Sequence, residues 1–416
     1  MVVSFTMLRC VESVPGRGSV SPSGQTTSLL ALKTRGGQEL QSLGRRIREW
    51  KQDYAEHHIT VGKRPGPSAI VMANNDYLSL GRDPRIIAAI VSALHDNSGD
   101  VFMSGVYTQY LDIHGEYEAA MADYLGSEAT VLCQSGWAAN DGLVQTLADT
   151  AMPVYVDLFA HASIWQGVHS AGAKARPFRH NDADNLEATV RRYGPGLITV
   201  DTVYSTNGDV CPLEEVVDIA DRHGCMVVAD ESHAAGLRGP AGAGLTAELG
   251  LTERVHFRTM SLSKAFVGRG GIVAGSSKAL EFFRYQSRPA IFSSAVLPYE
   301  TAGFLATLNA VRDDEWRRDN LRDNANYLRG GLSEAGCHIA SNDSPIIALV
   351  AGTEARTAEL RDRLEARNVF GAVFCAPATP KARSLVRLTV SATMSRAQLD
   401  HVIESCAAVR RETGLI

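Results

Sequence analysis

The sequence predicts an α/β protein, with a mostly parallel sheet between helices and a second, smaller α/β domain. First, 416 residues exceed what a single core usually holds. Second, short apolar runs alternate with helical stretches from about Asp96 to Leu297. These runs are apolar throughout, as is typical of parallel strands covered by helices on both faces. Third, the chain after Pro298 is first helical and then carries two weaker strand signals.

The order of elements suggests four regions. Residues 1–35 are rich in Ser, Gly and Thr, which predicts a flexible tail, and residues 36–95 are expected to join the small domain. Residues 96–300 form the predicted large domain and 301–416 the small one. Expected helices are Leu43–His58 and Glu354–Ala366. Expected strands are Ser68–Ala73, Ala129–Cys133, Pro153–Val156, Leu197–Val203, Met226–Ala229, His256–Met260, Ile272–Ala274, Ile346–Val350 and Ser384–Val390.

Composition argues against several classes of function. The net charge of −5 gives no basic surface for nucleic acid and no polybasic patch for a membrane. The chain has no run of about eighteen apolar residues, and its start lacks the apolar core of a signal peptide. The seven cysteines are scattered, without a C-x-x-C pair, so neither a disulfide framework nor a metal site is expected. We therefore expect a cytoplasmic protein.

Lys264 stands just past an apolar strand, in MSLSKAF, with Gly268, Gly270 and Gly271 close behind it. A lysine that forms a Schiff base needs a lowered amine pKa and close approach to an aldehyde, which small neighbours allow. Ser261 in the same segment is able to bind a phosphate. Taken alone, the pattern is more often a surface lysine in a glycine-rich turn.

Asp230 and His233 favour the Schiff-base lysine over the surface lysine. The run VVADESH ends a buried strand in two carboxylates and a histidine, about thirty residues before Lys264. An aspartate there can keep the pyridine nitrogen of pyridoxal 5'-phosphate (PLP) protonated, which makes the ring an electron sink. The alternative is a pair of helix-capping carboxylates beside a core histidine. The combination with Lys264 matches the spacing of fold-type I PLP enzymes.

Two further strand ends carry suitable groups. Ser135, Gly136 and Trp137 form a strand-to-helix turn whose N–H groups suit a phosphate. His161, which follows the next strand, can stack on a flat heteroaromatic ring, although alone it is more often structural. Because ligands bind at the carboxyl ends of strands in such sheets, these residues are expected to share one rim.

These motifs resemble the α-oxoamine synthases over about residues 73–409. The matching segments are NDYLSL at Asn75, SGWAAN at Ser135, HAS at His161, DESH at Asp230, SLSKA at Ser261 and VRLTVSA at Val386. Within that family the likeness is greatest to the α-hydroxyketone autoinducer synthases, through CQSGWAAN, LFAHASIWQG and RPAIFSSAVLPYETAG. The resemblance implies a fold-type I PLP-dependent transferase, whose large domain has a seven-stranded, mostly parallel sheet.

The resemblance also implies a role for each matching position. Lys264 would hold PLP and transfer the proton at Cα, Asp230 would pair with the pyridine nitrogen, and His233 would bind the 3-oxygen. The remaining implied contacts are His161 on the ring face, Gly136, Trp137 and Ser261 at the phosphate, Ser293 or Ser294 at the phosphate of a neighbouring subunit, Ser205 near the amino substrate, and Asn75 and Arg387 at the substrate carboxylate. The site would then be shared across a homodimer.

The implied reaction forms a carbon–carbon bond. A carbanion (quinonoid) derived from an amino acid, with S-adenosylmethionine or 2-aminobutyrate as the expected donor, attacks an acyl-CoA and gives an α-aminoketone. The segment Phe102–His114 fits neither branch well, so the electrophile stays open. One alternative is loss of methylthioadenosine from S-adenosylmethionine, followed by bonding to a non-thioester electrophile such as the nicotinamide ring of NAD. An aminotransferase and a catalytically inactive scaffold are the others.

Overall fold

The structure is a computed structural model that describes residues 37–53, 58–96, 104–110 and 112–416. It divides into two units, Met1–His58 and Ile59–Ile416. The predicted tail, residues 1–35, lies outside the described residues. The domain boundaries expected at residues 95 and 300 stay predictions.

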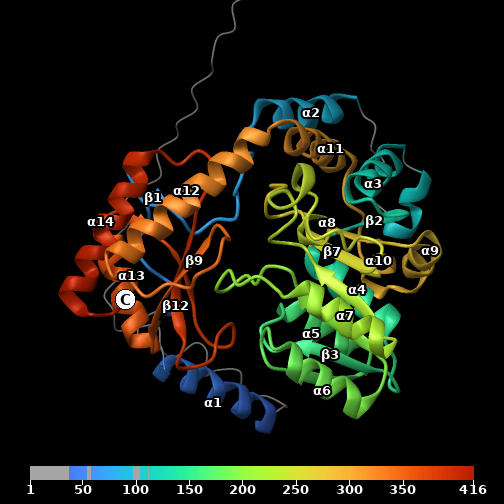
Figure 1. The fold of residues 1–416 in the computed structure, drawn as a ribbon, viewed down its shortest axis with the longest axis horizontal. Coiled ribbons are helices and arrows are strands. Elements are labelled where there is room, and N and C mark those ends of the chain that lie inside the picture. Colours follow the sequence, from blue (N-terminus) through green and yellow to red (C-terminus); the bar gives the residue numbers. More distant parts are fainter. Residues whose placement is uncertain (1–36, 54–57, 97–103, 111) are drawn as a thin grey trace, which may run out of the picture. The chain divides into compact units, whose positions relative to one another are not determined.

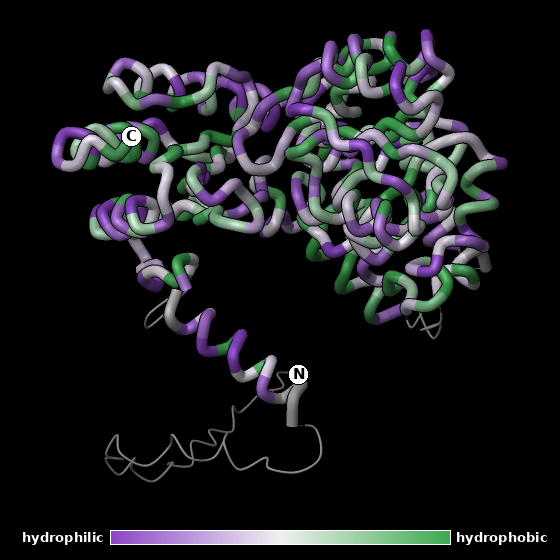
Figure 2. The backbone as a smooth tube through the Cα atoms, turned by 90° about the horizontal axis from the view of Figure 1, so that it is seen from below, coloured by the Kyte–Doolittle hydropathy of each residue, from purple (hydrophilic) through white to green (hydrophobic). Residues whose placement is uncertain are grey.

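The first unit contains one described helix, α1 (Gly37–Asp53). It is largely hydrophilic along its length, as its mostly purple tube in Figure 2 shows. Leu43, Ile47 and Trp50 are exposed at helical spacing. The sequence placed this helix at Leu43–His58, and residues 54–57 of that range are outside the described part.

The second unit is built on a seven-stranded sheet in the order β2-β8-β7-β6-β5-β3-β4. Figure 1 labels β2, β7 and β3 of this sheet. Only β8 runs antiparallel to its neighbours, so the predicted, mostly parallel sheet is confirmed. The strands are β2 (Ala129–Cys133), β3 (Pro153–Asp157), β4 (Lys174–Phe178), β5 (Leu197–Asp201), β6 (Met226–Asp230), β7 (Phe257–Ser261) and β8 (Gly271–Gly275).

Apolar residues alternate between the two faces of this sheet. On β6, Val228 packs in one cluster with α4 (Gly136–Leu147) and α5 (Ala162–Ser170). Val227 and Ala229 pack in the other, with α6 (Ala183–Tyr193) and α7 (Leu213–His223). Both faces are covered by helices, which explains why the strands are apolar without polar alternation.

The strand β4 is absent from the sequence prediction. It lies at the edge of the sheet, contains Pro177, and buries fully only Phe178. An edge strand carries fewer apolar residues because one side has no neighbouring strand, so hydrophobicity alone does not reveal it.

The C-terminal part forms a separate antiparallel sheet in the order β11-β12-β9. Its strands are β9 (Ile346–Gly352), β11 (Ala372–Phe374) and β12 (Ser384–Thr389). The predicted helix is α13 (Glu354–Glu365), and α12 (Glu315–Glu334) and α14 (Arg396–Thr413) pack with it. The N-terminal strand β1 (Ile70–Val71) pairs in parallel with β10 (Val369–Phe370), far away in the sequence.

The remaining helices join these sheets. They are α2 (Pro84–His95), α3 (Asp112–Leu125), α8 (Leu245–Glu248), α9 (Ser277–Gln286), α10 (Arg288–Ile291) and α11 (Pro298–Asp313), with short 3₁₀ turns η1 (Gly105–Tyr110) and η2 (Pro240–Gly242). Within the described part of the chain, none of these helices has the length and apolarity needed to cross a membrane.

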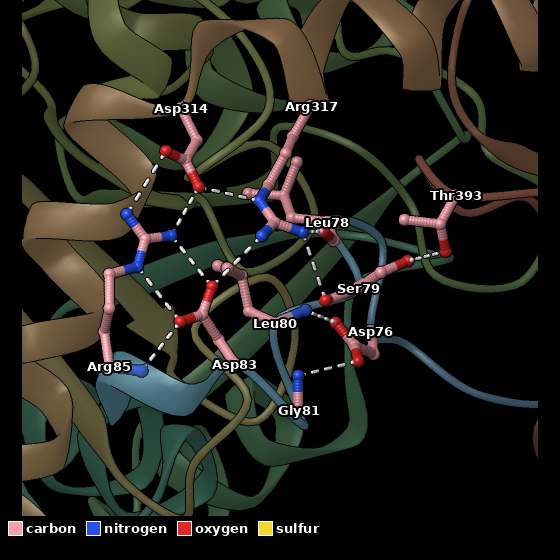
Figure 3. A network of polar contacts seen from close by, with 10 residues as sticks. All are labelled: Asp76, Leu78, Ser79, Leu80, Gly81, Asp83, Arg85, Asp314, Arg317 and Thr393. Carbon is pink, nitrogen blue, oxygen red and sulfur yellow. Dashed lines mark hydrogen bonds and ion pairs between the residues drawn. The ribbon is translucent and has the colours of Figure 1, made fainter. Parts of the chain in front are cut away.

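A network of ion pairs holds the segment that precedes α2 (Figure 3). Arg317 on α12 donates to the carbonyls of Leu78 and Ser79, at 2.9 and 3.2 Å, and pairs with Asp83 at 3.0 Å. Arg85 also binds Asp83, and these hydrogen bonds lower the pKa of the Asp83 carboxyl to about 2. Ser79 has a φ of +56°, a conformation that a non-glycine residue keeps only when neighbours fix it.

Arg317→Ala is expected to lower the free energy of unfolding by about 2–4 kcal/mol, because it leaves the buried Asp83 with one cation fewer and frees two carbonyls. Urea denaturation measures the change. The matched control is Arg322→Ala on the same helix, whose pair with Asp319 is exposed. That control is expected to change stability by less than about 0.5 kcal/mol. Equal losses in both variants would contradict this account.

Candidate functional site

Five strands deliver the predicted site residues to one rim of the sheet. β2, β3, β5, β6 and β7 all run in the same direction, since β8 is antiparallel to both of its neighbours. The residues that follow them therefore meet at the carboxyl edge, as the sequence predicts. They are Ser135 to Trp137, His161, Ser205, Asp230 to His233, and Ser261 to Lys264.

Lys264 lies in the loop after β7 and is half-buried. Burial lowers the pKa of its amine, the cation of Arg387 lowers it further, and Asp230 opposes both effects. A lysine in this environment gives up its proton more readily than a surface lysine, which suits a nucleophilic amine. The alternative of an ordinary surface lysine does not fit these surroundings.

Asp230 and Glu231 have different surroundings, although they are adjacent. Glu231 accepts hydrogen bonds from the backbone of Leu245 and Thr246, at 2.9 and 2.8 Å, and so caps the start of α8. Asp230 is buried at the end of β6 and accepts from the side chain of Asn140 at 2.6 Å. The capping interpretation of the acidic pair thus applies to Glu231, and Asp230 faces the site.

Asn140 is a site residue that the sequence analysis missed. It extends from α4, and its amide contacts Asp230 and Ser163, while its Oδ1 accepts from Thr259 at 2.6 Å. Ser163 in turn lies 2.7 Å from the Nδ1 atom of His161. A helical asparagine at 2% exposure is unusual, and the SGWAAN motif that contains it was the available signal.

Tyr77 is the second residue that the sequence analysis missed. Its hydroxyl lies 2.6 Å from Nδ1 of His233, and both side chains are buried. Burial, together with the nearby cations of Lys264 and Arg387, lowers the pKa of His233 well below its usual range. The ring of His233 is therefore neutral at pH 7.

The turn from β2 into α4 lies against the end of β7. A Cβ atom on Gly136 would come within 2.5 Å of the Cβ atom of Ser261, so only glycine fits there. Ser135 caps α4 by accepting the N–H of Ala138 at 3.0 Å. The first N–H groups of a helix have no partner within it, and here they lie beside the hydroxyl of Ser261. This arrangement suits a phosphate.

Arg387 is a buried cation held by neutral groups. It donates to the backbone carbonyl of Ser205 at 2.6 Å and to Oδ1 of Asn75 at 2.9 Å. Its side chain is 5% exposed, and among the described residues its Nε has no hydrogen-bond partner and no carboxylate pairs with it. A buried charge without a counter-ion is costly, so an anionic ligand is the expected partner.

Ser293 and Ser294 contact groups outside this set of residues. The hydroxyl of Ser293 donates to the carbonyl of Pro289, and Ser294 bridges to Ser104. Both serines are exposed next to Phe292, whose side chain is 81% exposed. Their predicted role at the phosphate of a neighbouring subunit stays a prediction.

A cavity of about 530 Å³ opens beside His161 and Ser205. Loops after β3 and β5 form one side of it, and β9, β11, β12 and the segment 377–380 form the other. Most of its walls are apolar. They include Leu158, Phe159, Trp165, Val350, Phe374 and Leu385, with Arg383 as the cationic group.

His180 supports one wall of this cavity. Its ring stacks on Phe159 with centroids 4.2 Å apart, and it bridges Asp157 and Asp209 at 2.9 and 3.3 Å. Burial acts to lower the pKa of His180, but the two carboxylates outweigh it and raise the pKa to about 9. Asp209 belongs to the turn that carries Ser205, so the charged ring holds that turn against β3.

The described part of the chain contains no cluster of three or more His, Cys, Asp or Glu side chains that would hold a metal ion.

Comparisons with known proteins point to one family. The model of the family described as aminotransferase class I and II matches residues 67–405. The CAI-1 autoinducer synthase of Vibrio campbellii is 43% identical over 356 residues, covering 86% of this chain and 90% of that protein. The 8-amino-7-oxononanoate synthase of Symbiobacterium thermophilum is 32% identical over 355 residues, covering 84% and 91%.

A solved structure of serine palmitoyltransferase from S. paucimobilis, with a bound PLP–myriocin aldimine, superposes with a TM-score of 0.82 at 27% identity. The alignment covers 90% of this chain and 98% of that one. An SPT structure with PLP as internal aldimine gives the same TM-score and identity.

His180→Asn is expected to destabilise the protein by about 1–2 kcal/mol at pH 6 and by much less at pH 10. The folded-state pKa lies above the ordinary value of 6.5, so the stabilisation is complete below about pH 6.5 and is lost as the pH rises through about 9. Urea denaturation at both pH values tests this. The control is His169→Asn, an exposed histidine on α5. A pH-independent loss in His180→Asn would rule out the charged bridge.

Proposed function

The chain belongs to the aminotransferase class I and II family and, within it, to the α-oxoamine synthases; on this basis we propose that it binds PLP through Lys264 and joins an amino acid to an acyl-CoA. It is a PLP-dependent transferase, as its similarity to 8-amino-7-oxononanoate synthase and to serine palmitoyltransferase indicates. The observation that carries the proposal is Arg387, a buried cation that lacks a carboxylate partner within the described residues and lies close enough to Lys264 to lower its pKa.

The residues present fit PLP. The α4 N-terminus and Ser261 would hold its phosphate, and Asp230 would pair with the pyridine nitrogen. His233, neutral and held by Tyr77, would bind the 3-oxygen. His161 lies near Lys264 and lines the cavity, where its ring would lie against a flat cofactor. These assignments follow the donor and acceptor character of each group.

When bound, PLP withdraws electrons from the amino acid and makes its Cα proton acidic. Lys264, with its lowered pKa, would take that proton from Cα once its amine is free. Asp230 would keep the pyridine nitrogen protonated, because a buried carboxylate stabilises a positive charge beside it. Arg387 would bind the substrate carboxylate with two N–H groups, and Asn75 would orient the guanidinium.

The cavity beside His161 would receive the acceptor. Its volume of about 530 Å³ and apolar walls suit an acyl chain, and Arg383 suits the phosphates of CoA. CoA would leave as a thiol, and loss of CO2 would give an α-aminoketone. We propose S-adenosylmethionine or 2-aminobutyrate as the amino donor.

A flat aromatic electrophile is a second candidate for the acceptor in this cavity. The aromatic side chains of Phe159, Trp165 and Phe374 line the cavity, and aromatic walls favour flat rings as well as chains. The nicotinamide ring of NAD would then accept the carbon that S-adenosylmethionine provides after it loses methylthioadenosine. Simple amino transfer is the remaining enzymatic alternative.

We further propose a homodimer with shared sites. Phe292 is 81% exposed beside Ser293 and Ser294, and Trp137 at the phosphate turn is 47% exposed. Exposed aromatic side chains near a site are typical of surfaces that a second copy covers. A cytoplasmic location stays a prediction.

Lys264→Ala is expected to abolish the visible absorbance band that a lysine-bound PLP gives the purified enzyme, because the variant has no amine to bond with the aldehyde. The matched control is Lys278→Ala, an exposed lysine on α9, which is expected to keep the band. Absence of the band from the PLP-saturated wild type would revive the scaffold interpretation.

Incubation with S-adenosylmethionine or 2-aminobutyrate, with and without acyl-CoA, separates the reactions. The proposed function predicts release of free CoA thiol together with an α-aminoketone, measured by thiol titration and mass spectrometry. Release of methylthioadenosine without consumption of acyl-CoA would overturn it in favour of the second candidate, tested next with NAD. Formation of a keto acid from the donor alone would identify an aminotransferase.

A further inference from the structure

Asn140 and Ser163 link Asp230 to His161 through a chain of hydrogen bonds. The Nδ2 atom of Asn140 lies 2.6 Å from Oδ2 of Asp230 and 2.9 Å from Oγ of Ser163. Ser163 lies 2.7 Å from Nδ1 of His161. Asn140 and Ser163 are 2% and 0% exposed, so water does not compete for these bonds.

The donor and the acceptor of each hydrogen bond in this network can be assigned. The carboxylate of Asp230 only accepts, so the Asn140 atom beside it must be the NH2 group. The carbonyl of Asn140 then accepts from the hydroxyl of Thr259 at 2.6 Å. The second N–H of Asn140 points to Ser163, whose oxygen is thereby an acceptor and whose single proton is left to donate.

The proton of Ser163 has His161 as its acceptor. The Nδ1 atom of His161 receives the hydroxyl of Ser163 and, at 3.3 Å, the backbone N–H of the same residue. An imidazole nitrogen that accepts carries no proton, so neutral His161 bears its proton on Nε2. His161 also lines the cavity proposed for the substrate.

We infer that Asn140 and Ser163 are positioning residues that hold His161 as the Nε2–H tautomer, so that its ring donates a hydrogen bond to an oxygen of the bound substrate. The identity of that oxygen rests on the proposed function, whereas the tautomer does not. Asn140 acts on both His161 and Asp230, because its amide donates one hydrogen bond to Ser163 and the other to Asp230.

The surroundings of His161 on balance favour its neutral form. Its surroundings desolvate the ring and lower its pKa; Asp230 raises the pKa and Lys264 lowers it again. Asp201 faces the backbone, accepting the N–H of His161 at 3.1 Å, and Trp137 meets the ring edge-on. A donor to Nδ1 stabilises the neutral ring, so loss of the Ser163 hydroxyl should raise the pKa of His161.

The first test is made on the wild-type holoenzyme labelled with 15N-histidine. Long-range 1H–15N NMR distinguishes the two neutral tautomers, and the His161 signals are assigned by their loss in His161→Gln. At pH 8 we expect the Nε2–H tautomer. Detection of the Nδ1–H tautomer in the wild type would overturn the inference, whether or not any substrate turns over.

The second test is Ser163→Ala. We expect mixed tautomers, an upward shift of about 0.5–1 pH unit in the acid limb of the pH profile of kcat/KM, and a loss in kcat of about tenfold. Asn140→Ala is expected to shift the same limb, because it frees Ser163. The control is Thr199→Val, which removes a buried hydroxyl that donates to Tyr155 and should leave both readouts unchanged. A slower Ser163→Ala enzyme with unchanged tautomer and pH limb would show a merely structural role.

Discussion

The arrangement of the site depends on a single buried carboxylate, that of Asp230. It lies at the end of a strand that helices cover on both faces, where an isolated charge would be strongly disfavoured. Asn140 and the N–H of Ser232 satisfy its oxygens, at 2.6 and 2.8 Å. The amide that satisfies Asp230 also orders Ser163 and His161, so one desolvated charge organises groups from three elements.

The second organising constraint is the course of the chain from Met72 to Asp83. Backbone hydrogen bonds join Met72 and Tyr77 to the segment at and beyond the end of β12. Arg317 and Asp83 fix the turn that follows (Figure 3). This course places Asn75 against Arg387 and Tyr77 against His233. An N-terminal segment thus completes a site whose other members come from the large sheet and from β12.

The two histidines of the site are neutral for a common reason but have different partners. Both are desolvated and near the cation of Lys264. His233 meets a buried phenol, whereas His161 meets a hydroxyl whose direction Asn140 sets. His180, farther out, has two carboxylate partners and is charged instead. The protonation of each ring therefore follows from its partners rather than from burial alone.

The sequence by itself determined the parallel sheet and the positions of Lys264, Asp230 and His161 after its strands, and it predicted their chemistry. Buried parallel strands are continuous apolar runs, and the polar residues that end them have to share one edge. It did not reveal β4, because an edge strand lacks a strong apolar pattern. Only the tertiary structure decided that Glu231 caps α8 while Asp230 faces the site, and that Tyr77 and Asn140 belong to it. The partner of a buried polar group can lie far away in the chain, 156 residues for Tyr77 and His233 and 312 residues for Asn75 and Arg387, so the local sequence does not identify it.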